Sequence, residues 1–156
     1  MSCDKDEDMT AMPQEPAVTV GPNQLAYGLT ESNELVAFNA NSPATFSSKT
    51  AVSGIPSGEK LLSIDFRPAT GELYAISSAS KFYIINTANA SSRAVSTTAF
   101  TPAIAGTVAS IDFNPTVDRI RLVTNIGQNL RLNPETGVLA AMDTSIVTTS
   151  SIAGIA

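Results

Sequence analysis

The chain has 156 residues, of which 43% are hydrophobic, 15% charged and 6% aromatic, and its formal net charge is -5. This length fits one ordinary domain, and the charge fraction is too low for a disordered chain, so we expect a folded body with its own core. The sequence contains no histidine, which excludes two-His zinc motifs, Ser-His-Asp and Cys-His nucleophile systems, and the usual general base near neutral pH.

Negative charge is concentrated near the amino terminus, where residues 4–8 read Asp-Lys-Asp-Glu-Asp. The rest of the chain is nearly neutral and has no basic stripe, whereas binding of a phosphate backbone needs clustered Lys and Arg. We therefore expect no nucleic-acid partner, and with few carboxylates and no imidazole we expect no metal and no cofactor. The chain has no apolar run of about 18 residues or more, so the sequence predicts no membrane-spanning helix.

Residues 1–22 are predicted to form a flexible acidic tether, because this stretch is polar, charged and contains proline. The single cysteine of the chain, Cys3, stands directly before the acidic run. This arrangement resembles the mature start of a bacterial lipoprotein, and the acidic run is similar to a surface-export signal. The resemblance implies lipidation of Cys3, an outer-membrane surface location and a native signal peptide that is absent from this chain. The alternative is a free surface thiol near a disordered end.

A repeat organises the chain after the tether. Leu-Ser-Ile-Asp-Phe-Arg-Pro at residues 62–68 aligns with Ala-Ser-Ile-Asp-Phe-Asn-Pro at residues 109–115, an offset of 47 residues. One step towards the amino terminus, residues 35–39 align with residues 82–86. Repeats of about 40 to 50 residues are typical of propeller blades and of helical arrays, which local periodicity distinguishes.

Local periodicity favours blades. The middle copy predicts four short strands, at residues 61–66, 72–77, 81–86 and 93–97, separated by turns such as Arg-Pro-Ala-Thr-Gly. No segment shows a sustained helical stripe. The predicted fold class is therefore all-β, a β-propeller-like array of about three four-stranded antiparallel blades.

The repeat domain is expected to cover residues 23–156, with approximate copies at residues 23–61, 62–108 and 109–155. The first copy lacks a clear opening strand. Closed propellers contain about four to eight blades, so three copies predict an incomplete ring. In such a ring, blade faces and strand edges remain open for a partner.

Three motifs carry a family resemblance: Ile-Asp-Phe-Arg-Pro-Ala-Thr-Gly-Glu-Leu-Tyr at residues 64–74, Asp-Phe-Asn-Pro at residues 112–115, and Gly-Gln-Asn-Leu-Arg-Leu-Asn at residues 127–133. With these motifs, residues 27–156 resemble a bacterial secreted-protein family that is classified only as a domain of unknown function and has a propeller-like repeat. The resemblance implies no catalytic residues. It also implies a family longer than the present chain.

Asp65 and Asp112 occupy equivalent positions in the second and third copies. Glycosidases need two carboxylates at a defined separation, so this pair is the candidate for catalysis. Their equivalence favours a structural role instead, in which each carboxylate accepts backbone N–H groups of the turn before Pro68 or Pro115. We therefore predict no catalytic residues.

The third copy carries polar side chains at strand positions where the second copy has aromatic and aliphatic ones. With two nearby amides, they form the candidate ligand- or partner-binding set: Arg121, Asn125, Gln128, Asn129 and Arg131. Such a cluster can bind a carboxylate or sugar hydroxyls through charge-assisted and bidentate hydrogen bonds. The alternative is that these arginines and Arg119 pair with Asp112, Asp118 or Glu135 on a solvated face.

The sequence therefore predicts a non-catalytic binding or assembly module of the cell envelope, carried by a bacterial surface lipoprotein. Its expected partners are another protein chain or an envelope complex, with a glycan as an alternative ligand, and the membrane through the lipid on Cys3. Two other functions stay open. One is a carbohydrate-active enzyme that uses carboxylates on the propeller face. The other is a subunit that completes a propeller with another chain.

Overall fold

The computed structural model describes residues 21–147, 149–150 and 152–155, which form three antiparallel sheets and no helix. Sheet 1 contains β1 (Leu25–Leu29), β2 (Glu34–Asn39) and β3 (Phe46–Ala51). Sheet 2 contains β4 (Leu61–Phe66), β5 (Leu73–Ser77), β6 (Phe82–Ile85) and β7 (Ser92–Ala94). Sheet 3 contains β8 (Ala109–Asn114), β9 (Arg119–Thr124), β10 (Asn129–Leu132) and β11 (Leu139–Met142).

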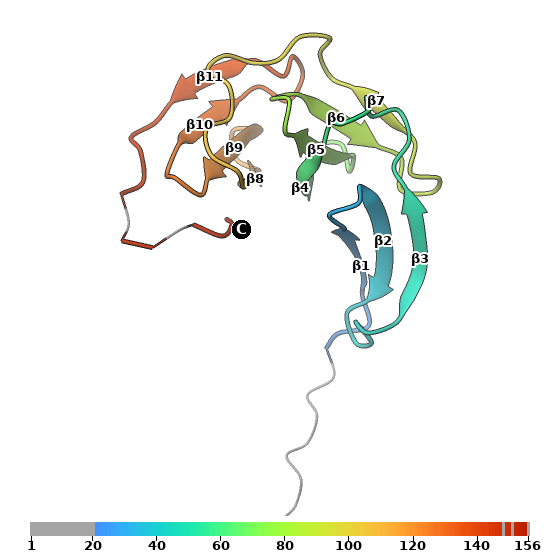
Figure 1. The fold of residues 1–156 in the computed structure, drawn as a ribbon. Coiled ribbons are helices and arrows are strands. Elements are labelled where there is room, and N and C mark those ends of the chain that lie inside the picture. The colour runs from blue at the N-terminus through green and yellow to red at the C-terminus, as the bar shows by residue number, and fades with distance from the viewer. Residues whose placement is uncertain (1–20, 148, 151, 156) are drawn as a thin grey trace, which may run out of the picture.

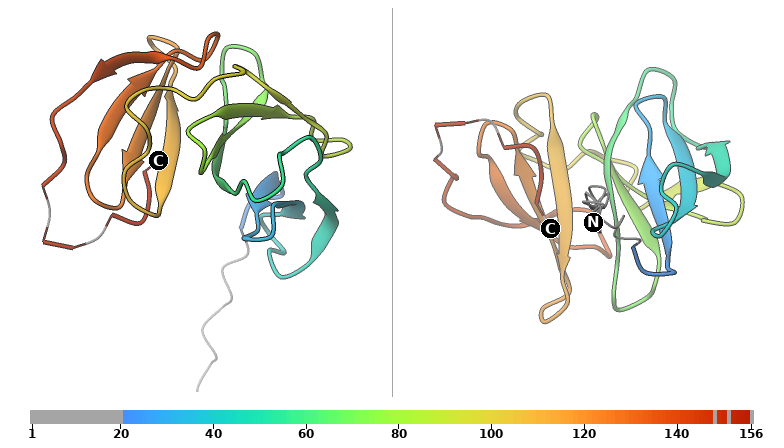
Figure 2. Two further views of the ribbon diagram at one scale, coloured as in Figure 1. Left: turned by 45° about the horizontal axis from the view of Figure 1, so that its top comes forward. Right: turned by 90° about the horizontal axis from the view of Figure 1, so that it is seen from below.

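The three sheets stand side by side around an arc. Strands β1, β4 and β8 lie on the inside of this arc, and β3, β7 and β11 lie on the outside (Figure 1). Figure 2 shows from two further directions that each sheet is a separate layer facing its neighbour. The four strands predicted in the middle copy are confirmed, and the arrangement is compatible with blade-like sheets.

The backbone repeats with the sequence. The turn between the second and third strands of a copy has a residue in the left-handed region in all three sheets, with φ 58° at Asn33, 58° at Ser80 and 85° at Gly127. These residues are 47 positions apart. The three strands of sheet 1 therefore correspond to the last three strands of sheets 2 and 3. Among the described residues, sheet 1 has no counterpart of β4 and β8, in agreement with the weak opening of the first copy.

Sheet 2 is covered on both faces. Successive strand side chains point to opposite faces, so one sheet can contribute to two cores. One face packs on sheet 1 through a cluster that is buried at these positions: Leu35, Leu61, Leu73, Ala75, Tyr83, Ile85 and Ala90. The other face packs on sheet 3 through a larger buried cluster: Tyr74, Ile76, Phe82, Ile84, Phe100, Ala109, Ile111, Phe113, Ile120, Leu122, Leu130 and Leu132.

The segment that connects β7 to β8 lies against the sheet 2 face that packs on sheet 3. The Val95 N–H donates to the carbonyl of Phe82 at 2.9 Å, and the Phe100 N–H donates to the carbonyl of Ser80 at 3.0 Å. The ring of Phe100 stacks on the ring of Phe82, with centroids 5.8 Å apart. This connection therefore closes the outer part of the core between sheets 2 and 3.

The segment after β11 follows the same path on sheet 3. The Asp143 N–H donates to the carbonyl of Asn129 at 3.0 Å, and the Ile146 N–H donates to the carbonyl of Gly127 at 2.9 Å. A side chain at Gly127 would collide with the carbonyl of Ile146, because a Cβ there would lie 2.1 Å from that oxygen. The chain then returns to the inside of the arc, where Ile155 contacts β8 (Figure 1).

The predicted tether and its lipidation site fall mainly on residues that the structure does not describe: Cys3 and residues 1–20 lie outside the described residues. Within the described part of the chain, no helix is long and apolar enough to cross a membrane.

Candidate functional site

The candidate site lies on the face of sheet 3 that points away from sheet 2. In sheet 2, the residues that pack on the following sheet are Tyr74, Ile76, Phe82 and Ile84. The residues 47 positions later form what we call the open face of sheet 3: Arg121, Val123, Asn129 and Arg131. No further sheet covers this face among the described residues, and on it Val123 and Asn129 are buried whereas the two arginine side chains are partly exposed. The repeat thus places polar and charged groups where an apolar contact surface stands one sheet earlier.

Two arginines on this face bind one carboxylate. The Arg131 guanidinium donates to both oxygens of Asp143, at 2.8 Å each. Arg121 donates to Asn129 Oδ1 at 2.7 Å and lies 3.2 Å from Asp143 Oδ2. The hydrogen bond from Arg131 holds the pKa of Asp143 below its ordinary value, and Arg121 contributes less to the same effect. We call these four residues the arginine cluster.

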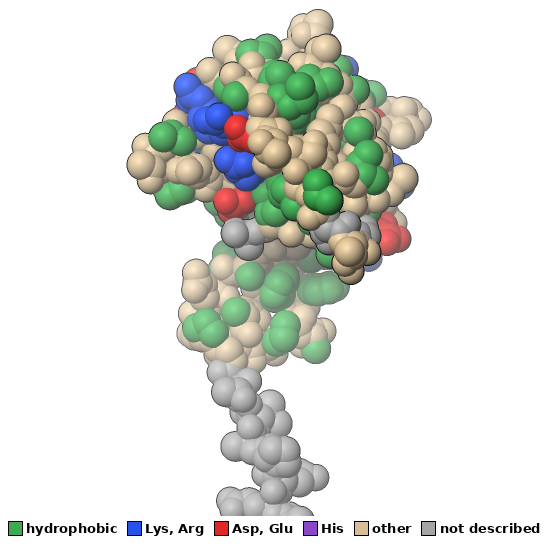
Figure 3. Space-filling view, turned by 90° about the vertical axis from the view of Figure 1, so that its left-hand side faces the viewer, with side chains coloured by type: hydrophobic (Ala, Val, Ile, Leu, Met, Phe, Trp, Pro, Cys, Tyr) green, Lys and Arg blue, Asp and Glu red, His purple; other side chains and the backbone are tan. Residues whose placement is uncertain are grey.

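The arginine cluster has spare binding capacity. It contains two guanidinium groups and one carboxylate, and the arginine side chains remain 41% and 44% exposed. A guanidinium has five N–H donors in a planar fork that matches a carboxylate. Figure 3 faces this side of the molecule and shows basic side chains gathered next to acidic ones. The cluster can therefore accept a further carboxylate or a comparable anion.

The two amides that the sequence grouped with these arginines have other contacts. Asn125 Oδ1 accepts the N–H groups of Thr107 at 3.0 Å and Val108 at 3.1 Å. Gln128 Oε1 accepts the N–H of Ala105 at 2.9 Å, and its amide donates to a carbonyl of the same loop at 2.9 Å. The structure therefore assigns Asn125 and Gln128 to the loop that leads into β8, whereas Asn129 joins the arginines.

Asp65 connects two sheets. Its carboxylate accepts the N–H of Phe66 at 2.8 Å within its own strand and the N–H of Phe113 in β8 at 2.7 Å. Burial raises the pKa of Asp65, and the two backbone hydrogen bonds act in the opposite direction. The predicted partner was the turn before Pro68, but the neighbouring strand provides the second donor because β4 and β8 lie side by side.

Asp112, the equivalent carboxylate in sheet 3, is half-buried on β8. Arg121 is its cross-strand neighbour on β9, yet that guanidinium binds Asn129 and Asp143 instead. In the described part of the chain, Asp112 has no hydrogen bond and no ion pair. Asp65 and Asp112 therefore differ in their surroundings although the repeat makes them equivalent.

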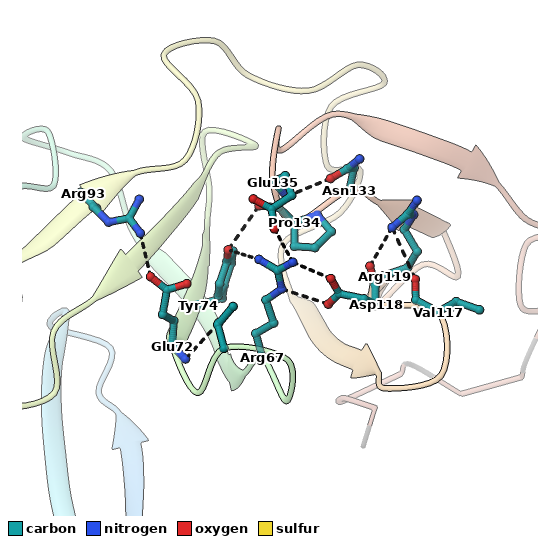
Figure 4. A network of polar contacts seen from close by, with 11 residues as sticks. Arg67, Glu72, Tyr74, Arg93, Val117, Asp118, Arg119, Asn133, Pro134 and Glu135 are labelled. Carbon is teal, nitrogen blue, oxygen red and sulfur yellow. Dashed lines mark hydrogen bonds and ion pairs between the residues drawn. The ribbon is translucent and has the colours of Figure 1, made fainter.

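Sequence reasoning missed a second cationic centre, shown in Figure 4. Arg67 is 5% exposed and extends from the β4–β5 turn towards sheet 3. Its guanidinium donates to Asp118 at 2.9 and 2.5 Å, to Glu135, and to Tyr74 Oη at 3.3 Å. The Tyr74 hydroxyl donates in turn to the carbonyl of Pro134 at 3.3 Å. These bonds raise the pKa of Arg67, with Asp118 as the largest cause, and lower that of Asp118.

Arg67 also changes the ion pairs expected for the third copy. The sequence offered Asp118 and Glu135 as partners for the arginines of that copy, but both carboxylates bind Arg67. Arg119 donates to the carbonyl of Asp118 at 2.9 Å rather than to a carboxylate. The repeat alignment could have pointed to Arg67, because the residue 47 positions later is Asn114. The arginine is therefore not repeated in sheet 3.

A hollow of about 420 Å³ lies on sheet 2, beside the ends of β5 and β7. Its two charged lining groups, Glu72 and Arg93, are paired to each other at 2.8 Å. No group of three or more His, Cys, Asp or Glu side chains suited to a metal occurs among the described residues. The arginine cluster is therefore the surface with the most distinctive chemistry.

The fold and this site define an all-β protein made of repeated antiparallel sheets, with polar and charged side chains on one face of sheet 3. The family model described as "Domain of unknown function (DUF4394)" matches residues 34–154, and the chain belongs to this family. A similar solved structure is that of Raptor from Chaetomium thermophilum, with 11% sequence identity and a TM-score of 0.49. That match covers 86% of this chain and 13% of that chain, so this chain spans a small part of the length of Raptor. A comparison with curated proteins finds no match.

Proposed function

We propose that the chain is a non-catalytic binding or assembly module of a bacterial cell-surface lipoprotein, and that its sheets are three blades of an incomplete β-propeller-like ring. The partner binds the open face of sheet 3. The observation that carries this proposal is the exchange of an apolar contact surface for the arginine cluster at equivalent repeat positions. A repeat face that meets a different neighbour needs different side chains.

The chemistry of the cluster defines the partner. Two guanidinium groups share Asp143, and neither is paired with Asp112, the other carboxylate on this face, so several N–H donors have no carboxylate partner. Between sheets 2 and 3, the guanidinium of Arg67 on one sheet binds two carboxylates of the other. We expect the N–H donors of the arginine cluster to bind a carboxylate of a partner in the same way. The partner is therefore an envelope protein that presents a carboxylate on the surface that meets sheet 3.

Photo-crosslinking in cells of the native host tests this partner role. Ala141 is the cross-strand neighbour of Arg131, so a benzoylphenylalanine at position 141 places the probe at the cluster. We expect a discrete adduct with one envelope protein, identified by mass spectrometry, and loss of at least about nine-tenths of that adduct in Arg121→Ala and Arg131→Ala.

Arg93→Ala is the control, because Arg93 forms an ion pair with Glu72 on another sheet that is more exposed than the pairs of the arginine cluster. It should leave the adduct unchanged, and thermal unfolding should show that all three variants stay folded. An adduct of equal yield in every variant, or no adduct at all, contradicts the proposal.

Lipid attachment is tested separately through Cys3. Cells of the native host that are fed radiolabelled palmitate should label the protein and place it in the outer-membrane fraction. Cys3→Ser should remove both the label and the membrane association, whereas Ser2→Ala should leave both nearly unchanged. Label that persists in Cys3→Ser would show that the anchor lies elsewhere.

The alternative of a carbohydrate-active enzyme rests on Asp65 and Asp112. Both oxygens of Asp65 are engaged by backbone N–H groups, which favours a structural carboxylate over an acid or nucleophile. Release of reducing sugar from envelope glycans that stops in Asp65→Asn and in Asp112→Asn, with both variants folded, would replace the binding module by an enzyme.

A further inference from the structure

The inner strands of sheets 2 and 3 are joined by side chains. Strand β8 is the end strand of its sheet, so the N–H groups on its free side have no partner strand. Two side chains of β4 accept these groups: Ser63 Oγ accepts the Ile111 N–H at 3.2 Å, and Asp65 Oδ2 accepts the Phe113 N–H at 2.7 Å. A serine and an aspartate two residues apart therefore hold the next inner strand in register.

The same pair recurs on β8. Ser110 and Asp112 are the residues 47 positions after Ser63 and Asp65, and they point to the side of sheet 3 that carries the open face. Ser110 Oγ already accepts the Ile155 N–H at 3.3 Å and lies 3.5 Å from the Ile155 carbonyl. Asp112 has no hydrogen bond or ion pair among the residues that the structure describes. Ser110 thus already accepts a backbone N–H group, whereas Asp112 has no such partner among the described residues.

The chain that reaches Ser110 repeats the entry to β8. Ile-Ala-Gly at residues 104–106 precedes β8, and Ile-Ala-Gly at residues 152–154, 48 positions later and so one residue beyond the repeat period, precedes the Ile155 contact. Both segments follow a connection that binds an equivalent carbonyl, with the Phe100 N–H donating to Ser80 and the Ile146 N–H donating to Gly127; the donor in sheet 3 lies one residue before the repeat equivalent of Phe100. The segment that reaches Ser110 therefore resembles the segment that leads into β8, and Ile155 lies three positions before the repeat equivalent of Ile111, the residue that binds Ser63.

We propose that the inner side of β8 is a docking site for the inner strand of a fourth sheet, with Ser110 and Asp112 accepting its backbone N–H groups. The occupant is an extended strand with the pattern that β4 and β8 share, Ser-Ile-Asp-Phe-x-Pro, entering along Ile155. Its N–H groups stand two residues apart, like those of Ile111 and Phe113. This inference deepens the proposed assembly role and rests on it, because it states which element of a partner sheet meets β8.

Extension of the chain by one strand tests the docking site. Residues 110–115 are copied after Ala156, so that the added Ser-Ile-Asp-Phe-Asn-Pro continues as β8 continues from Ala109. A second chain carries the same six residues in scrambled order. Hydrogen exchange is measured by mass spectrometry on both chains, and we expect the added amides of the ordered extension to exchange at least about tenfold more slowly than the scrambled ones.

Asp112→Asn in the extended chain should remove most of this protection, because an amide is a weaker acceptor than a carboxylate. The same substitution in the original chain should shift the thermal unfolding midpoint by no more than about 1 °C, since Asp112 has no partner there. Asp65→Asn is the comparison variant, and it should lower the midpoint because it weakens the existing bond to Phe113.

Equal exchange in the ordered and scrambled chains would overturn the docking site, and so would protection that persists in Asp112→Asn. Protection that disappears on dilution together with a light-scattering mass of two chains also overturns it, because the occupant would then be a second copy. These failures are separate from failure of the proposed function. The crosslinking yield reports on Arg121 and Arg131, and the exchange experiment reports on Asp112 without any envelope protein.

Discussion

The face of sheet 2 that meets sheet 3 and the open face of sheet 3 occupy equivalent positions of one repeat, yet their chemistry is opposite. The covered face buries aromatic rings, with Tyr74 and Phe82 2% and 1% exposed. Arg67, in the turn next to this face, is almost fully buried and binds carboxylates of the neighbouring sheet. The open face carries two arginines that are nearly half exposed and share Asp143.

The comparison indicates that the repeat determines the strands of each sheet, whereas the side chains on each face depend on the surface that the face contacts. Strands β5 and β6 are buried on both faces, whereas the equivalent strands β9 and β10 carry polar residues on one face. Both remain strands because residues fit a pleated sheet through packing with their neighbours, which either kind of face allows. What differs is the surface that each face meets. Asn129 replaces Phe82 without loss of the strand because β10 keeps Leu130 and Leu132 on its covered face.

Truncation at paired repeat positions gives the largest difference between the two faces. Phe82→Ala removes a fully buried ring that stacks on Phe100, and we expect it to cost about 3–5 kcal/mol of unfolding free energy. Asn129→Ala removes hydrogen bonds to Arg121 and to the carbonyl of Thr144, and we expect about 1 kcal/mol. Urea unfolding measures both. Equal costs would mean that the open face is as tightly packed as the covered one.

The second largest difference in unfolding free energy is expected between truncations of Arg67 and Arg131. Arg67→Ala leaves Asp118, Glu135 and the Tyr74 hydroxyl without their cation, and we expect a loss of about 2–3 kcal/mol because the guanidinium is buried while its carboxylate partners are partly solvated. Arg131→Ala breaks an exposed pair and should cost less than about 1 kcal/mol. Urea unfolding at neutral pH measures both values. A cost for Arg131→Ala equal to that for Arg67→Ala would show that the open face is held as firmly.

Acid should weaken the covered interface in a defined pH range. Arg67 holds the pKa of Asp118 below its ordinary value of about 4, so this carboxylate stabilises the fold above that pH and the contribution is lost as the pH falls through the lowered value. Asp118→Asn should therefore be less stable than the original chain at pH 6. Once the pH falls below the lowered pKa of Asp118, the two chains should approach the same stability. Urea midpoints measured at several pH values test this, and a difference that is constant with pH would contradict it.

The sequence predicted the fold better than it predicted the site. Four strands in the middle copy were predicted within two or three residues of their observed ends, because alternation and turn residues are local signals. Of the five candidate binding residues, Arg121, Asn129 and Arg131 come together, while Asn125 and Gln128 bind the loop before β8. Side-chain partners in loops are set by tertiary packing, and composition does not reveal them.

The sequence by itself determined that this chain is built from a 47-residue repeat of short antiparallel strands and that the third copy differs from the second in polarity. Only the tertiary structure decided that these polar positions face away from sheet 2, and that Asp143 lies between the two arginines. It also joined Arg67 to Asp118 and Glu135, which follow it by 51 and 68 residues. Strand patterns depend on neighbours along the chain, whereas these contacts depend on how whole sheets stack, and a repeat leaves that stacking free to differ from one sheet to the next.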